Sequence, residues 1–353
     1  MDQSEECKPS KQSLLFAFRV GGKPGVANRR SVTTSEVYSV RHLFIINPAA
    51  GKKGSTAELE KLLGALSFEH EVVYTKEAGD AEHIARAAAQ TGEELRIYAC
   101  GGDGTLNEVV NGAAGFDNAA ITCVPKGTGN DFLKIFGPNY RDQFYDLEAL
   151  AVGPQTSFDL IDCNGKLGID MVCAGVDARI GAGVHRYKNW PFVSGIGAYI
   201  LSLIEHVLFK GISRPLHVEM GARTLDGPSA LLCVCNGRYY GGGFMPVPEA
   251  MPDDGVLDML YVNKVSLYQL PGLLGKYAKG RYKELPKFVT DFHGQSISFR
   301  ADEEITAVVD GEVMRDTSFT VCLSVKKVNF FYPTYASYAV EISTPTSAQK
   351  AVL

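Results

Sequence analysis

Long apolar runs, paired cysteines and glycosylation sites are all missing from this 353-residue chain. No segment reaches the roughly 18 consecutive apolar residues that a membrane-spanning helix needs. None of the eight cysteines forms a CxxC pair, and most of them lie within apolar, strand-like runs. We therefore expect buried free thiols in a reducing compartment rather than disulfides or zinc ligands.

Charge and histidine content exclude further classes of function. The net charge of −5 gives no reason to expect nucleic acid as a partner. The seven histidines show no metal-ligand spacing, and neither an HExxH motif nor a Ser-His-Asp pattern stands out. A hydrophobic content of 45% is ordinary for a globular protein, and the length favours two lobes that each bury a core.

The first 40 residues differ in composition from the rest of the chain. They mix lysine and arginine with glycine, serine and threonine, and their one apolar patch, at residues 14–18, is too short for a signal-peptide core. The composition favours a disordered tail over residues 1–40. A targeting or membrane-touching tail is the alternative.

Strands and helices alternate over residues 41–150. Buried strands are predicted at 43–46, 72–75, 95–100 and 119–124, with helices at 55–66 and 80–90 between them. This alternation predicts an α/β lobe, a parallel sheet with helices on both faces. Ligands of such sheets collect at the carboxyl ends of the strands, where three loops rich in glycine, asparagine or lysine would converge.

The most informative of these loops is Gly101-Gly102-Asp103-Gly104, between a predicted strand and a predicted helix. Glycines at such a turn let backbone amides face outward at a helix N-terminus, where polyphosphate binds. A carboxylate facing phosphate is repulsive unless a cation stands between them, so Asp103 predicts a metal-nucleotide site. The loop matches neither the Rossmann fingerprint nor a Walker A loop.

Residues 151–325 have a different pattern. Short alternating runs separated by glycine, asparagine and proline turns predict an antiparallel, β-sandwich-like second lobe with one helical insertion. The C-terminal segment, 326–353, begins close to Phe330-Phe331-Tyr332, which we expect to return to the first lobe. The chain is thus predicted to have two domains.

Five motifs occur in order along the chain: Asn47-Pro48-x-x-Gly51-Lys52, Gly101-Gly102-Asp103-Gly104-Thr105-x-Asn107-Glu108, Pro125-x-Gly127-Thr128-Gly129-Asn130-Asp131-Phe132, Pro248-x-Ala250-x-x-Asp253-Asp254-Gly255-x-Leu257-Asp258 and Asp310-Gly311-Glu312. Over residues 42–332 the chain resembles the bacterial-type diacylglycerol kinase-like lipid kinases, a wider family that includes sphingosine and ceramide kinases. The resemblance implies the NAD kinase and diacylglycerol kinase-like fold.

The resemblance also implies ATP and Mg²⁺ as cofactors. The residues it assigns to the nucleotide are Asn47, Pro48, Ala49, Ala50, Gly51, Lys52, Thr75, Gly101, Gly102, Asp103, Gly104, Thr105, Leu106, Asn107 and Thr128. Ala50 stands where many relatives have serine, which removes one hydroxyl contact and leaves the backbone cradle unaffected.

Phosphoryl transfer needs positioning, cations and a carboxylate near the acceptor hydroxyl. Asp103 is the predicted Mg²⁺ ligand, direct or through water. The resemblance places Asp310-Gly311-Glu312 across the cleft, with Asp310 favoured as the catalytic base over Glu312. A plain Asp-Gly turn with a solvated glutamate is the alternative.

A second metal is implied at the Asp253-Asp254-Gly255 turn. In relatives this segment holds a structural Mg²⁺, and the matching ligands here are the carbonyls of Met251 and Val256 and the carboxylate of Asp254. All-oxygen coordination suits a hard cation. The alternative is a plain turn, as Asp-Gly between apolar segments often forms.

These observations predict an ATP-dependent lipid kinase that phosphorylates diacylglycerol or a related lipid and so forms phosphatidic acid in phospholipid metabolism. A kinase of a sphingoid base or NAD, or a binding protein that has lost catalysis, are the alternatives. We expect a cytoplasmic protein in peripheral contact with the membrane, and a homodimer is possible. Residues 192–209 predict an amphipathic helix flanked by basic residues, which would either anchor at a membrane or pack on the second lobe.

Overall fold

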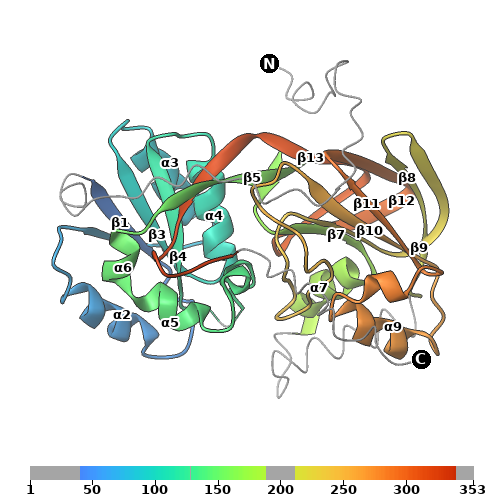
Figure 1. Cartoon of the computed structure of the whole chain (residues 1–353), viewed down its shortest axis with the longest axis horizontal. Helices are drawn as coiled ribbons and strands as arrows, with labels where there is room; N and C mark the ends of the chain where they lie inside the picture. The colour runs from blue at the N-terminus through green and yellow to red at the C-terminus, as the bar shows by residue number, and fades with distance from the viewer. Residues whose placement is uncertain (1–39, 128, 188–210, 339–353) are drawn as a thin grey trace, which may run out of the picture.

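The computed structural model describes residues 40–127, 129–187 and 211–338. The N-terminal tail, Thr128, the helix predicted at 192–209 and residues 339–353 lie outside the described residues. The chain forms two lobes, which lie side by side in Figure 1.

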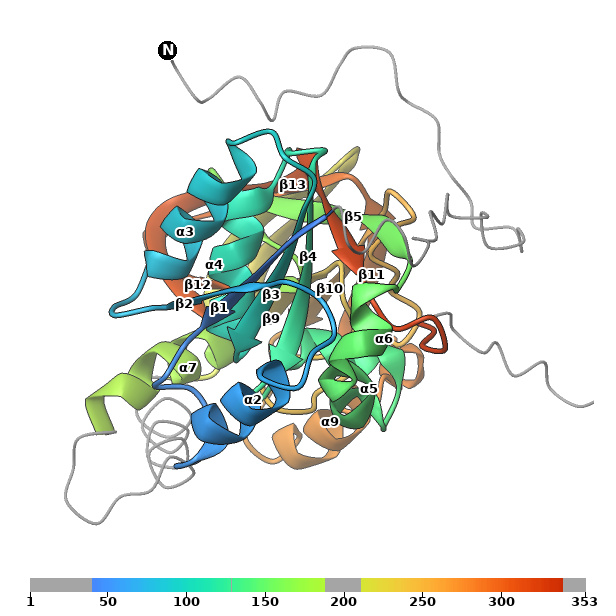
Figure 2. The same ribbon diagram turned by 90° about the vertical axis from the view of Figure 1, so that its left-hand side faces the viewer.

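The first lobe is the predicted α/β unit. Its elements are β1 (Arg41–Ile46), α2 (Ser55–Leu63), β2 (Glu71–Tyr74), α3 (Asp80–Ala89), β3 (Leu95–Gly101), α4 (Asp103–Ala113), β4 (Ala119–Pro125), a 3-10 helix (Phe132–Phe136), α5 (Tyr140–Tyr145) and α6 (Leu147–Ala151). The strands are parallel in the order β2-β1-β3-β4. Helices α3 and α4 cover one side of this sheet, and α5 and α6 cover the other (Figure 2).

Burial on both faces explains why the central strands are continuous apolar runs. Every residue of β3 and β4 is buried, as expected for parallel strands between two helical layers. Helix α3 buries Ala81, Ala85, Ala88 and Ala89, which recur at helical spacing on one face. Because β1, β3 and β4 are parallel, their carboxyl ends lie at one edge of the sheet, as predicted.

The second lobe is antiparallel, as predicted. Its elements are β5 (Gln155–Cys163), β6 (Lys166–Gly168), β7 (Met171–Gly175), α7 (Val176–Tyr187), β8 (Arg214–Met220), β9 (Arg223–Cys235), β10 (Leu257–Asn263), α9 (Leu270–Tyr277), a 3-10 helix (Tyr282–Glu284), β11 (Val289–Gly294), β12 (Ser296–Val309) and β13 (Glu312–Phe331). The strand order across this part of the sheet is β11-β10-β9-β7-β12-β13, and β8 pairs with β9 and β12.

Strand β13 joins the two lobes into one sheet. Its first half pairs with β12, and its second half pairs with β5. At Asn329 and Phe330 it also runs parallel to β4 of the first lobe. The ring of Phe330 lies 5.5 Å from that of Phe132, within the core of the first lobe. Figure 1 shows the strand arching from one lobe to the other.

Six cysteines are free and buried among the described residues, in agreement with the expectation from the sequence. Cys322 differs, since it is disulfide-bonded. Among the helices of the described ranges, none is long and apolar enough to cross a membrane.

Candidate active site

The loops after β1, β3 and β4 meet at the carboxyl edge of the parallel sheet. Asn47 follows β1, and its Nδ2 donates to Oγ1 of Thr105 at 3.1 Å. The ammonium of Lys126, which follows β4, donates to the Asn47 carbonyl at 3.1 Å and to Oγ1 of Thr56 at 2.7 Å. Three loops that are distant in sequence are therefore tied together by Asn47 and Thr105 of the predicted site and by Lys126, which the sequence analysis did not assign to it.

Close backbone packing explains two of the glycines. A Cβ atom on Gly51, whose φ is +86°, would lie 2.5 Å from the Lys126 carbonyl oxygen. A Cβ atom on Gly101 would lie 2.2 Å from Oγ1 of Thr105. Substitution of Gly51 would push the loop after β1 away from the loop after β4, and substitution of Gly101 would displace the Thr105 side chain in the first turn of α4.

The remaining residues predicted to bind nucleotide lie around this edge. Pro48, Ala49, Ala50 and Lys52 belong to the loop after β1, where the Ala49 amide donates to Oδ1 of Asn47. The Thr75 amide follows β2 and donates to the Ile46 carbonyl at 2.9 Å. Gly102 precedes α4, and Gly104, Leu106 and Asn107 lie in its first turns. Thr128 lies outside the described residues.

Asp103 is the first residue of α4 and fixes the loop after β4. Its Oδ2 accepts from the Asn130 amide at 2.8 Å, and its Oδ1 accepts from the Asp131 amide at 2.6 Å. Burial, together with the charges of Asp131 and Asp310, raises the pKa of Asp103 to about 6 although these amides oppose the shift. A cation beside this carboxyl would offset that repulsion.

Asp310 forms a tight hairpin and at the same time faces the first lobe. Asp310 and Gly311 have φ values of +46° and +94°, as the two central residues of a hairpin between β12 and β13 require. The carboxylate accepts from the backbone amides of residues 169–171, at 2.7 Å for Ile169 and 2.8 Å for Met171. It also accepts from Nδ2 of Asn107 at 3.2 Å. The residue that forms the hairpin turn is therefore also a partly buried acidic group.

Burial raises the pKa of Asp310, and these four donors oppose the shift. A carboxylate offers about four lone-pair positions. The acceptor capacity of Asp310 is therefore largely used by its own fold. Glu312, the other candidate base, begins β13 and is exposed, and it does not line the cavity beside Asp310.

Two acidic residues that received no role from the sequence lie beside these groups. Asp131 accepts from the Gly242 amide of the second lobe at 2.7 Å and pairs with Lys134. Asp170 is 7% exposed, and its buried Oδ1 has no hydrogen-bond partner among the described residues. Burial and the charges of Asp310, Asp131 and Asp103 raise its pKa well above the ordinary value. Its signal in the sequence is a single acid between the apolar residues Ile169 and Met171.

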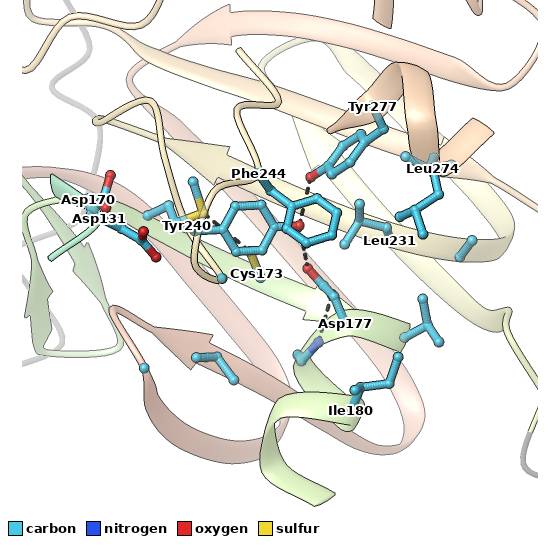
Figure 3. Close-up of a pocket in the computed structure, with 18 of the residues that line it drawn as sticks. Asp131, Asp170, Cys173, Asp177, Ile180, Leu231, Tyr240, Phe244, Leu274 and Tyr277 are labelled. Carbon is cyan, nitrogen blue, oxygen red and sulfur yellow. Dashed lines mark hydrogen bonds between the residues drawn. The ribbon is translucent and has the colours of Figure 1, made fainter. Parts of the chain in front are cut away.

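These acids border a cavity of about 380 Å³ that continues into the second lobe. Asp103, Asp131, Asp170 and Asp310 lie at one part of its lining. The rest is mostly apolar, from β7, β9, α7, α9 and the glycine-rich loop 239–244; the apolar residues include Ile180, Ile212, Leu231, Phe244, Val262, Leu270, Leu273 and Leu274. Figure 3 shows Asp131 and Asp170 at one side, away from the apolar residues.

One polar chain crosses the apolar part of the cavity. The hydroxyl of Tyr240 donates to Oδ2 of Asp177 at 3.2 Å and lies 3.2 Å from the hydroxyl of Tyr277 (Figure 3). Burial and nearby Cys233 raise the pKa of Asp177 to about 7. The cavity therefore combines an acidic part, next to the glycine loops, with an apolar part that contains one chain of three polar groups.

Comparison with known proteins agrees with this arrangement. Residues 41–163 match the model of the diacylglycerol kinase catalytic domain, and residues 170–331 match that of the YegS C-terminal NAD kinase beta sandwich-like domain. The chain belongs to the diacylglycerol kinase-like lipid kinase family.

Relatives of this lipid kinase family member include proteins of Staphylococcus aureus strains JH9 and Mu50 named "Putative lipid kinase". Each is 25% identical over 230 residues, which cover 64% of this chain and 73% of the relative. The crystal structure of a diacylglycerol kinase from Bacillus anthracis str. Sterne covers 83% of this chain and 96% of its own, with a TM-score of 0.63 and 23% identity. That likeness shows a common fold.

The lipid kinase family implies metals, and the two expected places differ in how well they fit one. Asp103 suits Mg²⁺, since it is an oxygen donor among like charges beside a predicted phosphate loop. Its neighbours Asp131 and Asp310 add to the negative charge that a cation would neutralise. Within the described ranges, however, no three acidic, histidine or cysteine side chains converge as a metal centre. A nucleotide-linked cation would therefore need phosphate or water to complete its ligands.

The turn over residues 251–256 is held by other means in this chain. Asp254 is exposed, and its Oδ1 accepts from the Val256 amide at 3.1 Å. The buried carboxylate of Asp159 accepts from the Gly255 amide at 2.9 Å and pairs with the Lys327 ammonium at 2.6 Å. Lys327 already supplies positive charge here, so a cation bound by Met251, Asp254 and Val256 stays a prediction for metal titration.

Proposed function

We propose that this protein is an ATP-dependent lipid kinase that transfers the γ-phosphoryl group to a hydroxyl of diacylglycerol or a related lipid. One observation carries the proposal. The loop that is suited to phosphate and the apolar cavity that is suited to an acyl chain share Asp103, Asp131, Asp170 and Asp310 in a single lining. A phosphoryl donor and a lipid acceptor would therefore meet at these carboxyl groups.

Nucleotide binding is assigned to the edge of the parallel sheet. Residues 47–52, Thr75, residues 101–107 and Thr128 would hold ATP, with the amides at the start of α4 facing its phosphates. Mg²⁺ bound near Asp103 would supply the positive charge that neutralises the transferring phosphoryl group. Asp103 itself orients the loop after β4 through the Asn130 and Asp131 amides.

The acceptor hydroxyl would meet the second-lobe carboxyls. Asp310 is the proposed proton acceptor, with Glu312 as the alternative, because Asp310 lines the cavity and Glu312 does not. Asp170 lies next to Asp310 and has unused hydrogen-bonding capacity on Oδ1. We assign Asp170 to contact with the acceptor head group, where its raised pKa favours a neutral carboxyl that can donate as well as accept.

The decisive experiment incubates the purified protein with labelled ATP and separate acceptors: diacylglycerol, ceramide, a sphingoid base and NAD. Labelled phospholipid from diacylglycerol, lost in Asp103→Asn, is the expected result. If NAD alone is labelled, the proposed acceptor is a dinucleotide and not a lipid. No labelled product from any acceptor, with ATP binding retained, would favour a binding protein without catalysis.

A further inference from the structure

A strongly basic segment lies in the second lobe of this acidic chain. Residues 264–287 contain six lysines or arginines and one acid, Glu284, giving a net charge of +5 against −5 for the whole chain. Glu284 pairs with Lys276 and Arg281. Lys264, Lys279 and Lys287 are exposed and form no ion pair within the part of the chain that the structure describes. Much of this positive charge is therefore available to a partner.

The same segment exposes apolar side chains. Leu267 is 50% exposed, Tyr268 is 83% exposed and Leu274 is 42% exposed. Three of the eight large apolar side chains exposed in the described ranges thus lie within eight consecutive residues. Such a concentration on one surface indicates an interaction site rather than scattered surface residues.

Helix α9 connects this surface to the cavity. Leu270, Leu273 and Tyr277 line the cavity from α9, and Leu274 is both a lining residue and an exposed one. Figure 3 shows Leu274 and Tyr277 on this helix beside the apolar part of the cavity. The apolar surface outside and the apolar lining inside are therefore continuous across a single helix.

We propose that the docking surface, defined as Leu267, Tyr268 and Leu274 with Lys264, Lys279 and Lys287, binds an anionic lipid bilayer. Exposed apolar groups surrounded by lysines are typical of segments that lie in the membrane interface. Charge complementarity selects an anionic surface, and continuity with the cavity selects lipid. Bound in this way, α9 lies where an acceptor passes from the bilayer into the cavity. The identity of that acceptor rests on the proposed kinase function, whereas binding to the bilayer can be measured without it.

Vesicle co-sedimentation of the full chain tests this surface. The vesicles contain phosphatidylcholine alone or with phosphatidylglycerol. Each lysine near an anionic surface changes binding by about fivefold, so Lys279→Glu with Lys287→Glu should weaken binding to the anionic vesicles at least about tenfold. Leu267→Ser with Tyr268→Ser should also weaken binding, by removing the inserted groups.

Matched controls lie elsewhere in the second lobe. Val325 is 75% exposed, and the neighbouring Lys326 is exposed too, so Val325→Ser and Lys326→Glu should leave binding unchanged. Phosphorylation of a short-chain, water-soluble acceptor should stay at the wild-type rate in both docking-surface variants. Loss of rate on vesicle-borne acceptor only would support the proposal.

Unchanged vesicle binding in both double variants would overturn the inference and leave the kinase proposal intact. If the double variants have lower thermal stability and unchanged vesicle binding, the surface forms a contact within this chain. If their mass by light scattering differs from that of the wild type, the surface binds a second copy of the chain. Vesicle binding that depends on the surface, without phosphorylation of any acceptor, would support docking and remove the kinase function instead.

Discussion

Asp310 determines the shape of the hairpin and also supplies a carboxylate to the cavity. Asp310→Asn should lower kcat about 10²- to 10⁴-fold, the range for loss of a positioned proton acceptor. ATP affinity should change little, because Asp310 contacts the residues assigned to the nucleotide only through Nδ2 of Asn107. The matched control is Glu312→Gln on the exposed neighbour, which should retain activity. If Glu312→Gln is the damaging change, the base is Glu312.

Asp103 should give the protein a pH dependence that can be measured. Its folded pKa, about 6, lies above the ordinary value of 3.8, so its contribution to stability is greatest below 3.8 and is lost as pH rises through about 6. Cation binding has the opposite dependence, since it requires the ionised carboxylate. We expect the Mg²⁺ concentration for half-maximal velocity to rise steeply below about pH 6. Asp103→Asn should remove this dependence together with most turnover.

The buried carboxyl of Asp170 should lower the stability of the folded protein, because it is placed for the site and not for the fold. A buried polar atom without a partner costs about 1 to 3 kcal/mol, and a carboxyl whose pKa is raised on folding destabilises the fold as pH rises. Asp170→Asn should therefore raise the melting temperature most at alkaline pH and lower kcat/KM for the lipid. Thermal unfolding across pH checks the first part. A lower melting temperature in the variant would show that Asp170 has a structural role.

At the scale of single elements, the loop over residues 239–244 of the second lobe contacts the first lobe through a hydrogen bond. The amide of Gly242, which has φ +87°, donates to Asp131, and Tyr240 lies in the cavity. No atom lies within 4 Å of a Cβ at Gly242, so Gly242→Ala adds only backbone strain of about 1 to 2 kcal/mol. We expect a several-fold higher KM for the lipid and little change for ATP. Gly272→Ala in α9, which has equal space and no positive φ, should not lower stability.

The helices and strands of the first lobe could be predicted from the sequence, because each one is marked by the residues of its own segment. Apolar runs gave β3 and β4, and the helix predicted from residue 55 begins there, although its N-cap is Gly54 and not Ser55, the residue that we expected from the sequence. The length of β13 was not predicted, since Lys326 and Lys327 are consecutive exposed residues that interrupt its apolar pattern. The significance of Asp170 could not be read from the sequence either. It depends on Asp310, which is 140 residues away in the chain.

At the scale of the whole molecule, one ion pair lies where the lobes join. Asp159 of β5 is buried and pairs with Lys327 of β13. Lys327→Gln would leave that carboxylate without its ammonium, which should cost about 2 to 3 kcal/mol in unfolding free energy, less than for a fully buried pair since Lys327 is half exposed. Added Mg²⁺ should restore part of this loss at the 251–256 turn. A fall in the wild-type melting temperature with chelator alone would instead show a cation already required there.

Continuity of the sheet through β13 limits how the gene could be divided. A cut between residues 163 and 170, where the two family models meet, would place β5 in one product and its partner β13 in the other. Each product would expose an unpaired strand edge, and such edges promote aggregation. The N-terminal product would also lose Phe330 and Tyr332 from its core. The two halves are therefore expected to be inherited, expressed and refolded only as a pair.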